Sequence, residues 1–321
     1  MRILTLKRSV VPAVAGVGAL ALVVLMLPPG RAPSSTIAQS PGAYRLAIGG
    51  LAADGFAPTV SISKSTAYQG GAIEVKATNA TAGQVTVLGR TYVLEPGAGN
   101  GVSGFVGFGT DDPPGPATLD ISVTGIDGQA TETTRPFTVL ATDWTVEDIV
   151  LPPGPSEILD DPAKINAEAA QDAAIYSKVT PRKWLDTWAA PVPISQADIT
   201  SYFGEQRSYN GGPPAGHHGG TDIGVPAGTP VHATNDGTVV LAQLTYVRGN
   251  FVIIDHGGGV FTGYGHMQSL AVTAGQTVKQ GDILGYVGQT GLATGPHLHW
   301  EMSVGGQLVD ALRWLDGTQG F

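Results

Sequence analysis

The sequence predicts a mainly β protein with four parts: an N-terminal membrane segment, an immunoglobulin-like β-sandwich, a short helical connector and a C-terminal antiparallel β domain. Three observations lead to this prediction. An apolar run follows basic residues at the N-terminus, short alternating runs separated by turn signals fill two long regions, and one alanine-rich stretch lies between those regions. The expected boundaries are residues 1–40, 41–142, 143–194 and 195–321.

The composition excludes several classes of protein. The 321 residues carry 17 lysines and arginines against 26 acids, a formal charge of −9, which argues against a nucleic-acid binder held by phosphate contacts. Because 42% of the residues are hydrophobic and only 13% are charged, wholesale disorder is excluded as well. The absence of cysteine excludes disulfides, thiolate nucleophiles, zinc fingers and iron–sulfur clusters.

The N-terminus indicates export from the cytoplasm. Arg2, Lys7 and Arg8 precede an uncharged run from Ser9 to Leu27, which is the pattern of a segment inserted with its N-terminus inside. An uncleaved anchor in the cell membrane and a cleaved signal peptide both fit, with a small-residue cleavage candidate at 36–38. Either way, the rest of the chain is expected outside the cytoplasm, secreted or anchored and facing the cell wall.

Seven short runs between residues 57 and 141 predict the strands of the sandwich. They are Thr59–Ser63, Ile73–Ala77, Gln84–Leu88, Arg90–Glu95, Val102–Phe108, Leu119–Val123 and Thr131–Val139. This number and spacing are typical of an immunoglobulin-like sandwich, although the cysteine pair of antibody domains is absent. No cluster of titratable residues occurs here, so we expect a spacer or an interaction module.

The connector is expected to contain one helix. Asp161 and Pro162 fit an N-cap followed by proline at the first helical position. A thin apolar stripe is expected to lie on a neighbouring surface, formed by Ala167, Ala170, Ala174 and Ile175. Trp184 and Trp188 are expected to anchor the connector by packing.

An internal repeat shapes the C-terminal domain. Val225–Val231 has an echo in Val272–Val278, and in each copy valines bracket a glycine turn. Further strands are expected at Gly237–Ala242, Phe251–Asp255, Ile283–Val287 and Leu298–Val304. These features predict hairpins that feed a two-sheet or barrel-like body. A biotinyl or lipoyl carrier with Lys279 as its attachment point is the alternative, but a carrier needs no histidines.

All seven histidines lie in this domain, and they suggest a metal site. They are His217, His218, His232, His256, His266, His297 and His299. A bend through two glycines can bring His218 and Asp222 to one point. On a strand, His297, His299 and Glu301 share a face. The two histidines would be about 6 to 7 Å apart, which is too far for two equal ligands and suits one ligand and one catalytic neighbour. Three nitrogen or oxygen ligands with one open position describe a catalytic zinc site.

Several ordered motifs in the region 195–321 resemble a known family. They are His218-x-Gly220-x-Asp222, Tyr264-Gly-His266-Met267, Gly295-Pro-His297-Leu-His299-Trp-Glu301 and the leading segment Ser201–Arg207. These motifs are similar to those of the M23 zinc metallopeptidases, the lysostaphin- and LytM-like peptidoglycan endopeptidases.

The resemblance implies one zinc ion per chain, with His218, Asp222 and His299 as ligands. It implies that His266 and His297 serve a metal-activated water as base and transition-state stabiliser, without dividing the roles between them. The implied activity is hydrolysis of peptide bonds in peptidoglycan peptides. The alternatives are a noncatalytic relative that activates other wall hydrolases, and a wall-binding module with an incidental metal.

The remaining candidates have structural readings beside functional ones. We expect His217 to be exposed beside the ligand, with substrate contact as the alternative, and His232 to occupy a surface strand. We expect His256 to be hydrogen-bonded at a strand end, with a second metal site as the alternative. Glu301 either orients a ligand histidine or makes a surface pair. Arg207 and Tyr209 either border the substrate groove or stabilise the fold. The groove loops are expected to be Tyr209–Gly216 and Leu244–Asn250.

Overall fold

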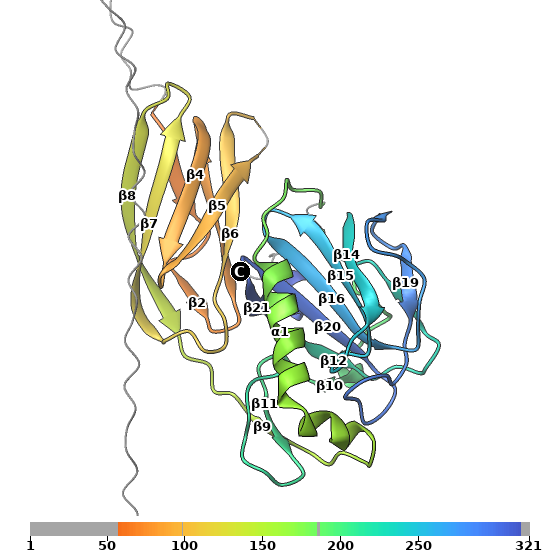
Figure 1. Cartoon of the computed structure of the whole chain (residues 1–321). Coiled ribbons are helices and arrows are strands. Elements are labelled where there is room, and N and C mark those ends of the chain that lie inside the picture. The colour runs from red at the N-terminus through yellow and green to blue at the C-terminus, as the bar shows by residue number, and fades with distance from the viewer. Residues whose placement is uncertain (1–56, 98, 185–186, 316–321) are drawn as a thin grey trace, which may run out of the picture. The chain divides into compact units, whose positions relative to one another are not determined.

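The computed structural model describes residues 57–97, 99–184 and 187–315 (Figure 1). The expected membrane segment at residues 9–27 lies outside these ranges. Within the described ranges, no helix is both long enough and apolar enough to cross a membrane. Strands dominate and helices are few, which confirms the mainly β prediction.

Eight strands in the first third of the described chain follow the hydrogen-bonded order β1-β3-β6-β5-β4-β7-β8-β2. Their bounds are β1 (Thr59–Ile62), β2 (Thr66–Tyr68), β3 (Ala72–Thr78), β4 (Ala80–Val87), β5 (Arg90–Pro96), β6 (Gly101–Gly107), β7 (Gly115–Gly125) and β8 (Ala130–Leu140). All neighbours are antiparallel except β2 and β8. The strands enclose an apolar core that includes Ile73, Val106 and Leu119. All seven predicted strands are present. Strand β2 was not predicted, because its three residues are too few to show alternation.

The connector contains short elements and one helix. They are β9 (Val146–Ile149), the 3-10 helix η2 (Pro155–Asp160) and α1 (Pro162–Tyr176), and the 3-10 helix η3 (Gln196–Asp198) follows the connector. The predicted N-cap is confirmed, because Asp161 accepts a hydrogen bond from the backbone N–H of Lys164 at 3.1 Å. Trp184 and Trp188 are buried with their ring centroids 5.3 Å apart, as predicted.

The predicted apolar stripe on α1 is wrong. The stripe positions are exposed or half-exposed: Ala167, Ala170, Ala174 and Ile175. The helix instead buries Glu168, Asp172 and Tyr176, which recur every four residues along one face. Alanine side chains have little area to bury, so polar partners on the neighbouring domain determine the orientation of this helix.

The C-terminal domain consists of two antiparallel sheets, in agreement with the two-sheet alternative. The larger sheet has the order β10-β12-β20-β16-β15-β14-β18, with β21 beside β20, and the smaller has the order β13-β19-β17. The bounds are β10 (Ile199–Ser201), β12 (Thr221–Ile223), β13 (Pro230–His232), β14 (Gly237–Leu244), β15 (Asn250–Gly257), β16 (Val260–Met267), β17 (Ser269–Leu270), β18 (Thr277–Val278), β19 (Ile283–Tyr286), β20 (Leu298–Val304) and β21 (Gln307–Val309). The 3-10 helix η4 (Ala311–Trp314) follows, and β11 (Gln206–Tyr209) pairs in parallel with β9. Strand β16 was not predicted, because Gly263 and Gly265 interrupt its apolar pattern.

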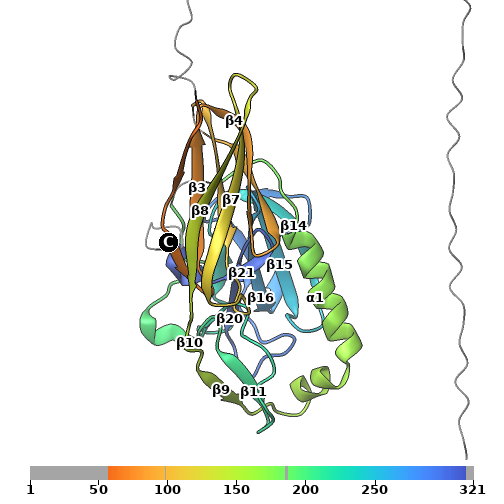
Figure 2. The ribbon, with the colours of Figure 1, turned by 90° about the vertical axis from the view of Figure 1, so that its left-hand side faces the viewer.

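Strand β20 divides its side chains between two faces of the larger sheet. Its even-numbered residues, from Leu298 to Val304, enter the main apolar core. His299 and Glu301 lie on the opposite face. Helix α1 runs across this second face (Figures 1 and 2), where Tyr176 packs 5.7 Å from the ring of Phe261. The alternation therefore places polar residues between the sheet and the connector helix.

Candidate metal centre

The pairing of two strands brings together the three predicted metal ligands. Asp222 in β12 lies directly opposite His299 in β20. His218 precedes β12, and the chain between it and Asp222 bends without forming a helix, as the two glycines predict. All three side chains are buried, with 6 to 7% of each residue exposed.

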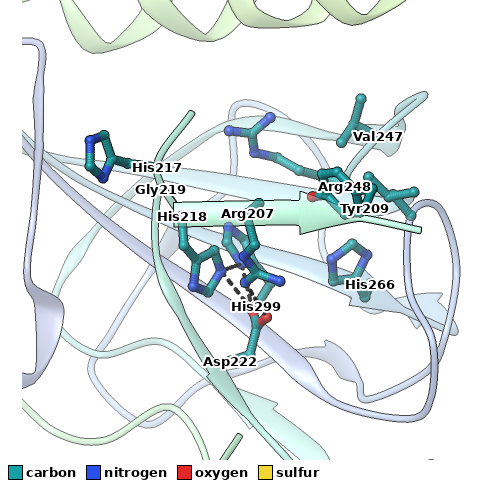
Figure 3. Close-up of a pocket in the computed structure, with 11 residues that line it drawn as sticks. Arg207, Tyr209, His217, His218, Gly219, Asp222, Val247, Arg248, His266 and His299 are labelled. Atoms are coloured by element: carbon teal, nitrogen blue, oxygen red, sulfur yellow. Dashed lines mark hydrogen bonds and ion pairs between the residues drawn. The ribbon is translucent and has the colours of Figure 1, made fainter. Parts of the chain in front are cut away.

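Three donor atoms converge at this point (Figure 3). Asp222 Oδ1 lies 2.8 Å from His299 Nδ1 and 3.1 Å from His218 Nε2, and the two nitrogens are 3.0 Å apart. A tetrahedral zinc ion with ligands at ~2.0 to 2.1 Å separates its donor atoms by roughly 3.3 Å. Two imidazole nitrogens and one carboxylate oxygen at this spacing fit zinc and leave a fourth position for a reactant.

Each donor is oriented by a second contact. The Nδ1 atom of His218 lies 3.0 Å from the carbonyl oxygen of Tyr202, and Nε2 of His299 lies 3.0 Å from Glu301 Oε1. Hydrogen bonds at these nitrogens leave the lone pairs of His218 Nε2 and His299 Nδ1 facing the centre. Arg207 donates to the other oxygen of Asp222 at 2.9 Å. Glu301 therefore orients a candidate ligand, and Arg207 is structural at Asp222 while also lining the cavity.

Burial and charge act in opposite directions on these groups. Burial opposes ionisation of Asp222, but the neighbouring imidazoles of His218 and His299 hold the pKa of Asp222 well below its usual value. Burial lowers the pKa of His218, which favours a free lone pair. Burial also opposes protonation of His299, yet its hydrogen bonds with Asp222 and Glu301 raise its pKa overall. A metal ion would compete with a proton for the Nδ1 atom of His299.

The two predicted catalytic histidines lie beside the donor atoms. The ring centroids of His266 and His297 are 4.7 Å apart, and His297 Nε2 lies 3.8 Å from Asp222 Oδ1. Their Nδ1 atoms lie 2.8 Å from the carbonyl oxygens of Thr290 and Gly295, respectively. Hydrogen bonds at Nδ1 leave both Nε2 atoms available.

The backbone of His266 adopts a left-handed conformation, with φ of +60°. Between the pairs Asn250–Met267 and Val252–Tyr264, β16 has one more residue than β15, which is a β-bulge. Within this bulge, the His266 N–H donates to the carbonyl oxygen of Arg248 at 2.7 Å. A non-glycine residue in this region costs of the order of 1 kcal/mol, and such strain is typical of functional positions. Burial, followed by the charges of His297 and His299, lowers the pKa of His266 to about 3. The bulge thus turns a neutral imidazole toward the centre.

A cavity opens over the donor atoms. Its walls include Tyr209, Val247 and Arg248, together with the candidate ligands and His266 (Figure 3). A second cavity shares Arg207, Tyr209 and Asp222 with the first and extends toward Glu147 and Leu151. Residues from both expected groove loops therefore line the cavity.

The other histidines lie outside the donor cluster. The expectation that His217 is exposed is wrong, because its ring packs 5.4 Å from that of Trp144 and its Nδ1 atom lies 2.7 Å from the carbonyl of Gly204. His232 ends a short strand, as predicted. His256 is buried and bonded to Asp236 O and Thr262 Oγ1, each at 2.7 Å, which confirms the structural reading. Lys279, the attachment residue in the carrier alternative, is not among the residues of this centre.

Arg248 and its partners on α1 form a buried polar cluster that the sequence does not predict. Arg248 donates from Nε to Glu301 at 2.6 Å and lies 3.3 Å from carboxylate oxygens of Glu168 and Asp172. The burial of Glu168 and Asp172 on α1 becomes recognisable only when the helix is placed against the sheet. No local pattern in the sequence could have revealed it.

Comparison with known proteins gives consistent results. Residues 216–311 match the family model described as Peptidase family M23. The chain is 37% identical over 150 residues to the peptidoglycan DD-endopeptidase ShyA of Vibrio cholerae, covering 47% of this chain and 35% of that protein. It is 42% identical over 93 residues to the DD-carboxypeptidase/endopeptidase Mpg of Neisseria gonorrhoeae, covering 29% of this chain and 21% of that protein. The chain thus spans about a third or less of these curated relatives.

One solved structure resembles most of the chain. A crystal structure from Pseudomonas aeruginosa, described as a candidate peptidase M23, superposes with a TM-score of 0.56 and 25% identity. The match covers 81% of this chain and 96% of that chain. The similarity therefore extends beyond the segment matched by the family model.

Proposed function

Because residues 216–311 form a domain of peptidase family M23, we propose that this protein is a zinc-dependent endopeptidase that hydrolyses peptide bonds in bacterial peptidoglycan. The convergence of His218, Asp222 and His299 beside two further histidines is the observation that supports this proposal most strongly. A noncatalytic regulator has no need of five such positions in one centre.

The proposal assigns a task to each residue. His218 Nε2, Asp222 Oδ1 and His299 Nδ1 hold one zinc ion, which supplies a Lewis acid that polarises a carbonyl and makes water acidic. His266 and His297 lie close enough to the centre to accept a proton from the attacking water, to donate a hydrogen bond to the developing oxyanion, and to return the proton to the leaving amine.

The names of the curated relatives favour one kind of bond. ShyA and ShyB of Vibrio cholerae are both described as peptidoglycan DD-endopeptidases. We therefore propose that the scissile bond joins D-configured centres in wall cross-links. Incubating the protein with defined cross-linked wall fragments and identifying the new termini by mass spectrometry tests this choice. Cleavage at any other bond contradicts it.

The same proposal extends to the organisation of the chain. Residues 195–321 are the peptidase domain, 143–194 the connector, and 41–142 an immunoglobulin-like sandwich that serves as spacer or interaction module. The run of eight strands around one apolar core supports the sandwich. Residues 1–40 direct export and either anchor the protein in the inner membrane or are removed. This arrangement presents the catalytic domain to peptidoglycan outside the cytoplasm.

Zinc content and wall hydrolysis test the proposed function together. Wild-type protein should contain one zinc ion and release soluble fragments from purified peptidoglycan, whereas His218→Ala should lose both properties because one of three ligands is missing. His232→Ala is the matched control, since this histidine lies outside the donor cluster. Hydrolysis that persists in His218→Ala, or wild-type protein that takes up no zinc, would refute the proposal.

A further inference from the structure

Helix α1 presents a polar face to the peptidase domain. Glu168, Asp172 and Tyr176 are each no more than 6% exposed, although alanines elsewhere on the helix could have formed an apolar contact. Burying carboxylates is unfavourable unless charged or hydrogen-bonded partners compensate for the lost hydration. The partners of these three residues therefore indicate what the polar face does.

Glu168 holds the loop that forms one wall of the catalytic cavity. Its carboxylate accepts hydrogen bonds from the backbone N–H groups of Val247 at 2.7 Å and Arg248 at 3.1 Å. Both of these residues line the cavity beside His266. Two backbone amides bound by one buried carboxylate restrict the position of this wall.

Arg248 connects the helix to the metal centre. Its Nη1 atom lies 3.3 Å from Glu168 Oε1 and 3.3 Å from Asp172 Oδ2, and its Nε atom donates to Glu301 Oε1 at 2.6 Å. The hydroxyl of Tyr176 donates to the other oxygen of Glu301 at 2.7 Å. Glu301 thus receives one hydrogen bond from the helix and one from a side chain that the helix positions.

These contacts hold the carboxylate of Glu301 in the position that orients His299. Oε1 of Glu301 lies within hydrogen-bond distance of both Arg248 Nε and His299 Nε2, and Oε2 accepts from Tyr176. Because Nε2 of His299 lies 3.0 Å from Glu301, Nδ1 of His299 is directed at Asp222 and His218. Partners of this kind affect metal affinity as well as ligand geometry.

The arrangement is maintained at a cost in stability. Neither carboxylate oxygen of Asp172 has a hydrogen bond among the described residues, although Arg248 lies nearby. An incompletely bonded buried carboxylate is destabilising, so packing alone gives no reason for it. Positioning of Arg248 does give a reason, because the guanidinium is held from two sides.

We propose that α1 is a working part of the catalytic unit, in which Glu168, Asp172 and Tyr176 are positioning residues that act through Arg248 and Glu301 on His299 and on the cavity wall. This inference rests on the proposed function. It adds that the connector, outside the segment matched by the family model, helps to determine zinc affinity and substrate binding.

Two conservative variants of the full-length protein separate the two effects. Tyr176→Phe removes only the hydrogen bond to Glu301, so zinc affinity, measured by competition with a chromophoric chelator, should fall by roughly tenfold. Glu168→Gln replaces one of two acceptor oxygens with a donor that faces backbone N–H groups, so the cavity wall should loosen. KM for a cross-linked wall peptide should therefore rise severalfold, with a smaller change in kcat.

Matched controls use exposed residues of the same types. Tyr68→Phe and Glu157→Gln should leave zinc affinity, kcat and KM unchanged, since both residues are exposed. Thermal unfolding identifies an assay temperature at which each variant is folded. Arg248→Lys provides a further test, because a lysine ammonium cannot reach Glu301 and both helix carboxylates as a guanidinium does, and zinc affinity should again fall.

The outcomes distinguish this inference from the proposed function. If wild-type protein binds zinc and cleaves peptides while all three variants stay within twofold of it in zinc affinity and KM, α1 is only a scaffold and the inference is wrong. If wild-type protein takes up no zinc, both proposals fail. A selective loss of zinc affinity in Tyr176→Phe and a selective rise of KM in Glu168→Gln support the inference.

Discussion

Gly220 offers a sharp test of how β12 and β20 together form the metal centre. A Cβ atom at this position would lie 2.5 Å from the carbonyl oxygen of Trp300 and 2.9 Å from Cε1 of His299. Both obstacles belong to β20, and one of them is the backbone. Gly220→Ala therefore forces one strand to retreat from the other by about 1 Å to reach ordinary van der Waals spacing.

The required movement is large compared with the tolerance of a metal site. Asp222 follows Gly220 by two residues and lies opposite His299, with their donor atoms 2.8 Å apart. Ligand distances in zinc sites vary by only about 0.2 Å. We expect zinc affinity to fall at least ~10-fold, the lower end of the effects seen when ligand orientation is disturbed. Overpacking of this kind costs about 1 to 3 kcal/mol of folding free energy.

Gly295→Ala is the matched control for this substitution. Gly295 also lies near the centre, but a Cβ atom there would meet nothing within 4 Å and its φ is outside the left-handed region. Chelator competition gives zinc affinity and thermal unfolding gives Tm, with about 2 to 4 °C expected per kcal/mol in a protein of this size class. If Gly220→Ala binds zinc within twofold of wild type and keeps its Tm, the argument from strand separation is refuted.

Three other predictions concern charge at the centre and in the core. Glu301→Gln keeps the shape of the side chain but removes its charge, and it should weaken zinc binding by about 10- to 100-fold. A zinc affinity within twofold of wild type would contradict the role of Glu301 in orienting His299. Arg207→Lys should lower zinc affinity by roughly 10-fold, because one ammonium cannot reproduce the guanidinium contacts that hold Asp222. An unchanged zinc affinity would show that the guanidinium of Arg207 is dispensable. Burial lowers the pKa of His256 from 6.5 to about 4, so the unfolded chain takes up protons first and stability falls as the pH drops through this interval. His256→Gln should flatten the dependence of unfolding free energy on pH by up to about 3 kcal/mol, as measured by urea titrations from pH 7 to pH 4, and equal slopes would contradict the assignment.

The alternating pattern of β20 made much of the fold and the candidate site predictable. Apolar residues alternate with His299 and Glu301, so both the core face and the polar face could be read directly from the sequence. Glycines between His218 and Asp222 predicted the bend that brings them together, and the structure places their donor atoms 3.1 Å apart. Local periodicity and local backbone freedom were sufficient here.

The sequence does not predict features whose conformation depends on partners far away along the chain. The buried face of α1 depends on a hydrogen bond that Glu168 accepts from a backbone N–H 80 residues away, and on one that Tyr176 donates to a side chain 125 residues away. Hydrophobic periodicity does not detect such partners, so it predicts the alanine face of α1 as the buried face, whereas the polar face is buried. The bulge that orients His266 depends on its register with β15, which the sequence of β16 alone does not define.

The parallel pairing of β9 with β11 has a consequence for how this domain can be exchanged between proteins. Ser201, Tyr202 and Arg207 all precede the segment matched by the family model, yet they contact His218 or Asp222. Glu147 of β9 in turn contacts Ser201 and Arg207. A recombination event that transferred only residues 216–311 would separate the candidate ligands from these supports. The segment that can be inherited or grafted as a working module therefore begins well upstream, at β9 near the start of the connector.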